Sequence, residues 1–184
     1  IFKDRSFFST IKVKRTVTAQ GLMHSFLHGD TIHNFQLRAP GLRTEPTSYY
    51  ARGGSFDVML QAVRGDGSPI SVSLVGMGAG AMSCYEVQGD NWTYFEIDPK
   101  IVDMALNPEL FSYLADCAPD PNILIGDARQ KLADVPEGSQ DLIIIDAFSS
   151  NAIPAHLLTR EAVAFYQSRL MESGSSIRLS VHWT

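Results

Sequence analysis

The chain divides into two stretches with different hydrophobic patterns. Up to about residue 50, apolar and polar residues alternate in short runs rich in Phe, Ile, Val and Thr, which is typical of half-buried β-strands. Beyond residue 50, short apolar runs alternate with segments whose apolar residues recur every three or four positions, as on one face of a helix. The sequence therefore predicts a small N-terminal β domain over residues 1–50 and a Rossmann-like α/β domain over residues 51–184. Its sheet should be parallel and doubly wound, because strands alternate with helices.

The predicted elements follow from these patterns and from turn residues. In the first stretch we expect strands over residues 7–17, 22–27 and 31–37, the last two joined by a turn at Gly29-Asp30. In the second we expect strands over residues 70–75, 92–97, 122–125, 141–146 and 176–181. Helices are expected over residues 55–63, 81–88, 99–106, 127–133 and 159–171. The run at 141–146 is too continuously apolar to be half exposed, which indicates a central strand.

A turn with three glycines follows the first strand of the predicted parallel sheet. Gly76, Gly78 and Gly80 alternate with Met77 and Ala79 before the next predicted helix. Glycines in this position allow a sharp turn and let a ligand approach the backbone without a Cβ in the way. The motif alone is also compatible with a simple tight turn, so its meaning depends on the residues around it.

Three acidic residues come at the ends of three successive strands of the predicted sheet. Glu96 lies 20 residues after Gly76, where a carboxylate can accept two hydrogen bonds from a ribose diol. Asp127 follows the next strand and can bind an exocyclic adenine amine, serve as a helix N-cap, or do both. Asp146 ends the fourth strand and should face the same crevice. We interpret the set as a binding site for an adenosine that carries a sulfonium, because carboxylates stabilise a nearby cation.

Other nucleotide classes and a metal site are not supported by the sequence. A Gly-Lys-Ser/Thr phosphate-binding motif is absent, and the acids suit a sulfonium better than a dinucleotide pyrophosphate. The five histidines show no ligand spacing, so no metal is expected. His33 and His156 fall near the expected crevice, although a partly exposed polar residue is the simpler interpretation of each.

Composition limits which binding partners and which cellular compartment are expected for the chain. The formal net charge is −5 and there is no basic run, so nucleic acid is not an expected partner. Cys84 and Cys117 have neither a Cys-x-x-Cys nor a metal-ligand spacing, and we expect both to be reduced and buried. No apolar run reaches about eighteen residues, so the chain is expected to be cytoplasmic, without direct membrane contact.

Taken in order, the motifs of this chain resemble those of the spermidine synthase family (polyamine aminopropyltransferases), in particular bacterial homologues fused to membrane segments. The resemblance runs from about residue 7 to residue 174. The matching pieces are Leu27-His28-Gly29-Asp30-Thr31-Ile32-His33, Thr47-Ser48-Tyr49-Tyr50, the glycine turn, Phe95-Glu96-Ile97-Asp98, Gly126-Asp127-Ala128 and Asp146-Ala147-Phe148-Ser149-Ser150.

The resemblance implies a fold, a reaction and roles for several residues. The family joins a small N-terminal β domain to a class I methyltransferase fold. It transfers the aminopropyl group of decarboxylated S-adenosylmethionine to an amine such as putrescine, without a metal. By resemblance, Glu96 would hold the ribose, Asp127 with Ala128 the adenine, and Asp146 would deprotonate the amine. Tyr49 would line the amine channel.

Two departures from the family pattern leave other functions open. Ala79 stands where the family has an Asp that contacts the aminopropyl ammonium, and the second Asp of the catalytic motif is missing after Asp146. Ala79 is compatible with ordinary S-adenosylmethionine, whose tail also carries a carboxylate. The alternatives are therefore a methyltransferase, or a non-catalytic nucleotide-binding domain of a membrane protein.

The two ends of the sequence suggest a piece of a longer protein. The chain begins at Ile1 and stops just after a predicted strand, so we expect the C-terminal strands of a methyltransferase sheet to be truncated. An uncovered edge strand invites pairing with another chain, which favours a homodimer. In a full-length protein the domain could be tethered to the inner membrane.

Overall fold

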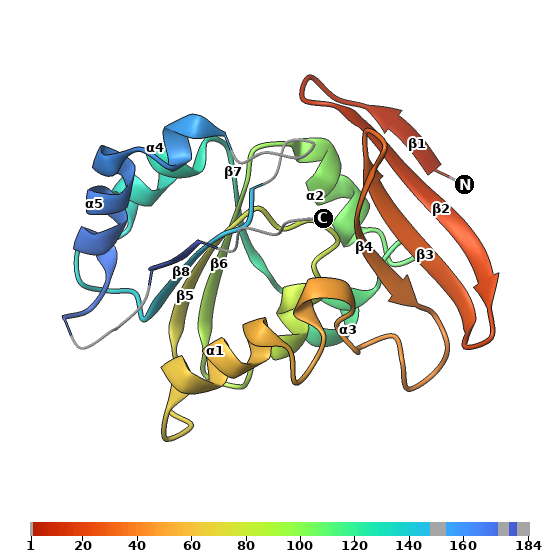
Figure 1. Ribbon diagram of the computed structural model, residues 1–184, viewed down its shortest axis with the longest axis horizontal. Helices are drawn as coiled ribbons and strands as arrows, with labels where there is room; N and C mark the ends of the chain where they lie inside the picture. Colours follow the sequence, from red (N-terminus) through yellow and green to blue (C-terminus); the bar gives the residue numbers. More distant parts are fainter. Residues whose placement is uncertain (1, 148–153, 173–176, 180–184) are drawn as a thin grey trace.

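The computed structural model describes residues 2–147, 154–172 and 177–179. Within these ranges the chain forms two sheets, with strand orders β1-β2-β3-β4 and β7-β6-β5-β8-β9. Figure 1 shows the first sheet standing beside the second, with α2 and α3 between them. The architecture is that of a parallel α/β domain with an antiparallel N-terminal sheet, as the sequence predicts.

The N-terminal sheet is a four-stranded antiparallel meander. Its strands are β1 (Phe2–Arg5), β2 (Thr10–Thr18), β3 (Gly21–His28) and β4 (Thr31–Leu37). The first of them was not predicted. Ile11 and Val13 on β2 are fully buried, whereas the polar residues beside them are more exposed, so one face covers a core. Gly29 makes the β3–β4 turn with a positive φ of 65°, a conformation that glycine adopts without strain.

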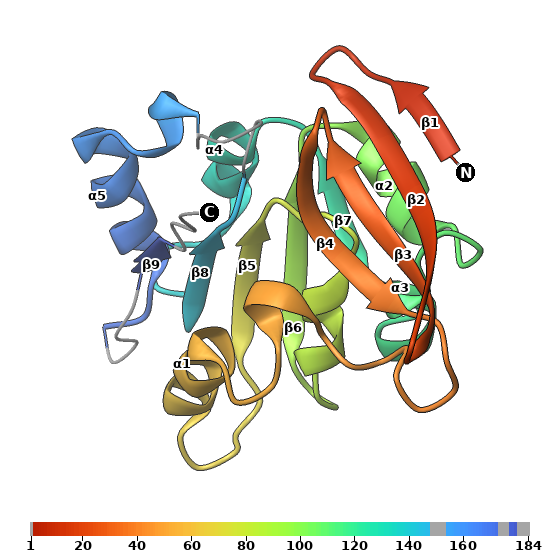
Figure 2. The same ribbon diagram turned by 45° about the vertical axis from the view of Figure 1, so that its right-hand side comes forward.

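The second sheet contains five parallel strands with β5 in the middle. Its strands are β5 (Ser71–Val75), β6 (Asn91–Glu96), β7 (Asn122–Ile125), β8 (Leu142–Ile145) and β9 (Ile177–Leu179). All four residues of β8 are buried, as its apolar run predicts. Figure 2 shows the carboxyl ends of β5, β6 and β8 at one edge of the sheet, the edge nearer to the β3–β4 turn.

Helices cover both faces of the parallel sheet. They are α1 (Ser55–Arg64), α2 (Pro99–Leu106), α3 (Tyr113–Cys117), α4 (Ala128–Lys131) and α5 (Arg160–Arg169). Leu142 and Ile144 pack into a core shared with α1, α2, α3 and the N-terminal sheet. Ile143 and Ile145 point to the opposite face, into a second core with α4 and α5. This alternation is the doubly wound arrangement that the sequence predicts.

The prediction of a helix over residues 81–88 is wrong. That segment holds a short 3₁₀ helix, η2 (Ala81–Tyr85), preceded by Gly80 in the left-handed conformation. Four of its five residues are buried, so it has no solvent-facing side along which an amphipathic helix could extend. Three further 3₁₀ turns complete the described elements: η1 (Ser48–Tyr50), η3 (Leu132–Asp134) and η4 (Ala155–Leu157).

The prediction of two reduced cysteines is also wrong. Cys84 in η2 and Cys117 at the end of α3 form a disulfide, with a Cα–Cα distance of 4.9 Å. The two residues are 33 positions apart, so no local spacing motif announces the pairing. They meet because η2 and α3 pack together, which only the tertiary fold determines. The bond ties the segment after the glycine turn to α3.

Candidate functional site

A cavity of about 290 Å³ opens between the two sheets, at the carboxyl ends of the parallel strands. This is the usual ligand position in an open α/β sheet. Most of the residues predicted from sequence line it: Tyr49, Gly76, Gly78, Glu96, Asp127, Ala128 and Asp146. Gly80 is not among the lining residues. The structure therefore brings together residues that are up to about a hundred positions apart in the chain.

The glycine turn brings the end of β5 against the start of the segment after β8. A Cβ on Gly76 would lie 2.6 Å from the carbonyl oxygen of Asp146, and the φ of Gly76 is +88°. A Cβ on Gly78 would meet nothing within 4 Å, so this residue leaves the cavity side open. Gly80 has a packing role instead, because a Cβ there would lie 2.9 Å from Cγ of Leu114 on α3.

Glu96 closes β6 with a buried carboxylate that the backbone holds in place. Its Oε2 accepts a hydrogen bond from the Met77 N–H (3.1 Å), and its Oε1 accepts one from the Asp98 N–H (3.0 Å). Burial raises the pKa of Glu96, while these backbone hydrogen bonds oppose the shift. Each carboxylate oxygen accepts more than one hydrogen bond, so the group can hold the glycine turn and still receive a diol.

Asp127 has the N-cap role that the sequence allows for it, and its second carboxylate oxygen faces a histidine. Its Oδ1 accepts a hydrogen bond from the Gln130 N–H at 3.1 Å, which makes it the N-cap of α4. Its Oδ2 lies 3.1 Å from Nε2 of His156 in η4. Asp127 and His156 both line the cavity, so the predicted adenine-binding carboxylate shares its position with an imidazole. That pairing was not predicted.

Asp146 lies at the end of β8 and accepts a hydrogen bond from the Tyr50 hydroxyl through Oδ2. Burial raises the pKa of Asp146 to about 7, and the hydrogen bond from Tyr50 partly opposes that shift. Burial likewise raises the pKa of Tyr50, so the phenol stays protonated and donates. A carboxylate that titrates near neutral pH is suited to act as a general base.

Tyr50 is a candidate functional residue that the sequence reasoning missed. The Tyr49-Tyr50 pair is visible in the sequence, and both residues line the cavity. They lie in the 3₁₀ turn η1, which separates the directions of neighbouring side chains. Only the tertiary contact shows that Tyr50 is bonded to Asp146. The serines at 149 and 150 and Asn151, which follow Asp146 in sequence, fall outside the described residues.

The wall on the side of the N-terminal sheet carries His28 and His33, with Asp98 next to them at the start of α2. Burial lowers the pKa of His33 to about 4 and also lowers the pKa of His28, so both rings are neutral at pH 7. Because His33 lines the cavity, it is more than the partly exposed polar residue that was the simpler interpretation of the sequence. Among the described residues, no group of His, Cys, Asp or Glu is arranged to hold a metal ion.

The charges of the cavity have one sign. Four carboxyl groups line it, from Glu96, Asp98, Asp127 and Asp146, and no lysine or arginine is among the described lining residues. A partly enclosed cavity with carboxylates and no fixed cation favours a positively charged ligand. It is poorly suited to a phosphate or pyrophosphate.

No protein-family model matches the chain, and no curated protein sequence matches it. Solved structures do match its fold. A probable spermidine synthase from Corynebacterium glutamicum ATCC 13032 superposes with a TM-score of 0.73 at 18% identity, over 94% of this chain and 61% of that one. The spermidine synthase from Thermotoga maritima gives a TM-score of 0.60 at 17% identity, over 95% and 54% of the two chains.

A third match is a spermidine synthase in complex with the transition state analogue AdoDATO. It gives a TM-score of 0.64 at 17% identity and covers 95% of this chain and 55% of that one. These likenesses show that the chain has the fold of spermidine synthases. The chain spans 54% to 61% of the length of these three proteins. No helix in the described ranges is long and apolar enough to cross a membrane.

Proposed function

We propose that this chain binds S-adenosylmethionine or its decarboxylated form and transfers the aminopropyl group of the decarboxylated form to an amine. One observation carries the proposal. The carboxyl of Asp146, held by the Tyr50 hydroxyl, opens into the same cavity as the glycine turn and Glu96. A nucleotide subsite and a base for an amine nucleophile therefore share one cavity.

The residues of the nucleotide half fit an adenosine. Gly78 leaves open space beside the turn, Glu96 offers carboxylate oxygens to a ribose diol, and Asp127 offers one to an exocyclic amine. The absence of lysine and arginine from the described lining suits a sulfonium rather than a phosphate. The structural neighbour bound to AdoDATO is consistent with such a ligand in this fold.

The chemistry assigned to Asp146 is the removal of one proton from the acceptor amine. The amine nitrogen attacks the aminopropyl carbon next to sulfur, a new C–N bond forms, and the C–S bond breaks. The electron pair of that bond goes to sulfur, which leaves neutral 5′-methylthioadenosine, and the proton lost by the amine goes to Asp146. A carboxyl with a pKa of about 7 can accept it near neutral pH. The Tyr50 hydrogen bond fixes the direction of the carboxylate.

A methyltransferase is the second candidate, and Ala79 favours it. Ala79 lies in the glycine turn and lines the cavity. Its side chain is a methyl group, so it offers no charge to an ammonium tail. A neutral residue there is compatible with the carboxylate of ordinary S-adenosylmethionine. Methyl transfer to an amine would use the same nucleotide subsite and the same base.

A donor comparison separates these activities. The chain is incubated with putrescine and either decarboxylated or ordinary S-adenosylmethionine, and the nucleoside product is identified by mass spectrometry. The proposal predicts 5′-methylthioadenosine and an aminopropylated amine from the first donor. S-adenosylhomocysteine with a methylated amine from the second donor would favour the methyltransferase instead.

Asp146→Asn is the matched control, because it keeps the shape of the side chain and removes the base. We expect it to lower turnover by about a hundredfold or more while nucleotide binding remains. If the native chain binds either nucleotide and forms no product with any amine, the transferase proposal fails and the binding-domain alternative holds.

A further inference from the structure

Three buried polar atoms without hydrogen-bond partners gather on one wall of the cavity. They are Nε2 of His28, Nε2 of His33 and Oδ2 of Asp98. Among the described residues, six buried side-chain atoms lack a partner, and the other three belong to residues that do not line the cavity. A buried polar atom left unpaired costs about 1–3 kcal/mol, so this clustering needs a physical reason.

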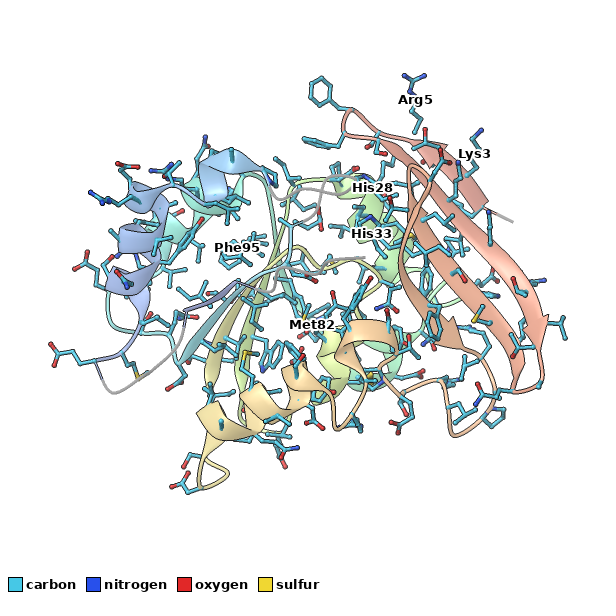
Figure 3. All side chains as sticks on the ribbon, viewed as in Figure 1. Lys3, Arg5, His28, His33, Met82 and Phe95 are labelled. Atoms are coloured by element: carbon cyan, nitrogen blue, oxygen red, sulfur yellow. A yellow bond between two sulfur atoms is a disulfide. The ribbon has the colours of Figure 1, made fainter. Side chains whose placement is uncertain are left out.

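The three side chains belong to different elements that converge beside α2. His28 ends β3, His33 lies on β4 across the turn, and Asp98 is the N-cap of α2. The His28 and His33 ring centroids are 5.7 Å apart, and the negative charge of Asp98 acts on His28. Figure 3 shows His28 and His33 one above the other, on the side of the N-terminal sheet that faces α2.

Their chemistry selects a cation. Asp98 is 1% exposed, and its Oδ1 is already used by the Lys100 N–H at 3.0 Å, which leaves Oδ2 as the free acceptor. A neutral imidazole presents one unprotonated nitrogen, and a primary ammonium donates three hydrogen bonds. An anion would meet the Asp98 carboxylate without a fixed cation to offset it, because no lysine or arginine is among the described lining residues.

We propose that His28, His33 and Asp98 form a subsite for a primary ammonium group. This inference rests on the proposed function and names a ligand group within the same cavity. The ammonium has two possible sources, the aminopropyl tail of the decarboxylated donor or the far end of a diamine acceptor. The subsite supplies the carboxylate of Asp98, the N-cap of α2, whereas the glycine turn offers only the uncharged Ala79.

Asp98→Asn is the decisive variant. Asparagine caps a helix as well as aspartate does, so α2 keeps its N-cap while Oδ2 loses its charge. Asp103→Asn is the matched control, because it removes the same charge from an exposed position on α2. His33→Phe is the second variant, since it removes Nε2 and keeps a ring against Phe26, whose centroid is 5.7 Å away.

Calorimetry with two ligand pairs identifies the source of the ammonium. Decarboxylated S-adenosylmethionine is compared with 5′-methylthioadenosine, which lacks the aminopropyl ammonium, and putrescine is compared with butylamine, which lacks the second one. If the donor supplies the group, Asp98→Asn weakens the first ligand by about tenfold or more and leaves 5′-methylthioadenosine within about twofold. If the acceptor supplies it, the same selective loss appears for putrescine against butylamine. His33→Phe should act in the same direction, and Asp103→Asn should change neither pair.

Equal effects on both members of each pair, or no effect on any, would overturn the subsite and leave ordered water as the partner of these atoms. That outcome differs from failure of the proposed function. If the proposed function fails, the native chain either binds no adenosine ligand, including 5′-methylthioadenosine, or binds one and forms no product with any amine, whatever happens at Asp98.

Discussion

Asp146 is the residue on which the proposed chemistry depends, and its protonation should set the pH range of the proposed activity. Its pKa of about 7 lies well above the ordinary value for an aspartate because the carboxyl is buried. Below that pKa the carboxyl carries a proton and cannot accept another. The active form of the base therefore accumulates as the pH rises through about 7.

We expect kcat/KM for aminopropyl transfer to increase about tenfold from pH 6 to pH 8, because the deprotonated fraction of Asp146 grows over that range. A second rise at higher pH would reflect ionisation of the acceptor amine itself. Titration of the Asp146 carboxyl carbon by NMR checks the same pKa without any turnover. A midpoint near 4 in that titration would contradict the assignment of Asp146 as a base tuned by burial.

Tyr50→Phe should move this pH dependence upward. The Tyr50 hydroxyl hydrogen-bonds the charged form of Asp146, and its loss raises the pKa of the carboxyl further. The midpoint of the kcat/KM profile should shift to higher pH, and activity at pH 7 should fall. Tyr94→Phe is the control, since Tyr94 donates to Glu86 and does not line the cavity. An unchanged profile in Tyr50→Phe, or an equal shift in Tyr94→Phe, would contradict the assignment.

Residues at strand ends were predictable from the sequence, and residues that act through a tertiary contact were not. Glu96, Asp127 and Asp146 follow recognisable strands, and parallel strands bring their carboxyl ends to one edge. No such pattern predicts the role of Tyr50, because its hydrogen bond to Asp146 joins positions 96 residues apart. The Cys84–Cys117 disulfide escaped prediction for the same reason.

Among the elements, the glycine turn couples the fold to the site most directly. Gly76 lies where β5 ends and contacts the backbone of Asp146, so the two strands β5 and β8 approach closely only without a side chain there. The turn is therefore responsible for the position of the proposed base, and it also lines the proposed nucleotide subsite.

Gly76→Ala should unfold the chain more easily than Gly78→Ala does. Both glycines have positive φ values, which cost a substituted residue about 1–2 kcal/mol. Only at Gly76 does the new Cβ also overlap a backbone oxygen, at 2.6 Å, and this raises the expected loss to about 3 kcal/mol or more. Urea unfolding measures both variants. Equal losses would mean that the close approach of Gly76 to Asp146 does not matter.

Element types followed from periodicity for helices with one buried and one exposed side, and from short apolar runs for strands of the parallel sheet. The strands of the parallel sheet and helices α1, α2 and α5 were predicted within a few residues. The segment at Ala81–Tyr85 was predicted as an α-helix and forms the 3₁₀ helix η2. Because the segment is buried on nearly all sides, its sequence has no amphipathic pattern from which the helix type could be predicted. Helix α3 was missed, since five residues are too few to show a period.

At the scale of the whole molecule, the cavity depends on both sheets. The parallel sheet contributes the glycine turn and the acids, and the N-terminal sheet contributes His28, His33 and their neighbours on β3 and β4. The two sheets also share one hydrophobic core, which contains Ile11, Val13 and Phe26 together with Leu74 and Ile144. A ligand in the cavity should therefore affect the amide groups of both sheets at once.

Hydrogen exchange with and without the donor nucleotide tests this arrangement. Binding at a hundred times Kd stabilises the native state by about 2.7 kcal/mol, which slows exchange wherever opening of the site is required. We expect added protection in residues 76–80 and, because the β3–β4 turn forms the opposite wall, in residues 28–33 as well. With 5′-methylthioadenosine, which lacks the ammonium, protection at 76–80 should persist and protection at 28–33 should be smaller if the donor supplies the ammonium. Protection confined to the parallel sheet for every nucleotide and amine would mean that the N-terminal sheet supports the fold without contacting the ligand.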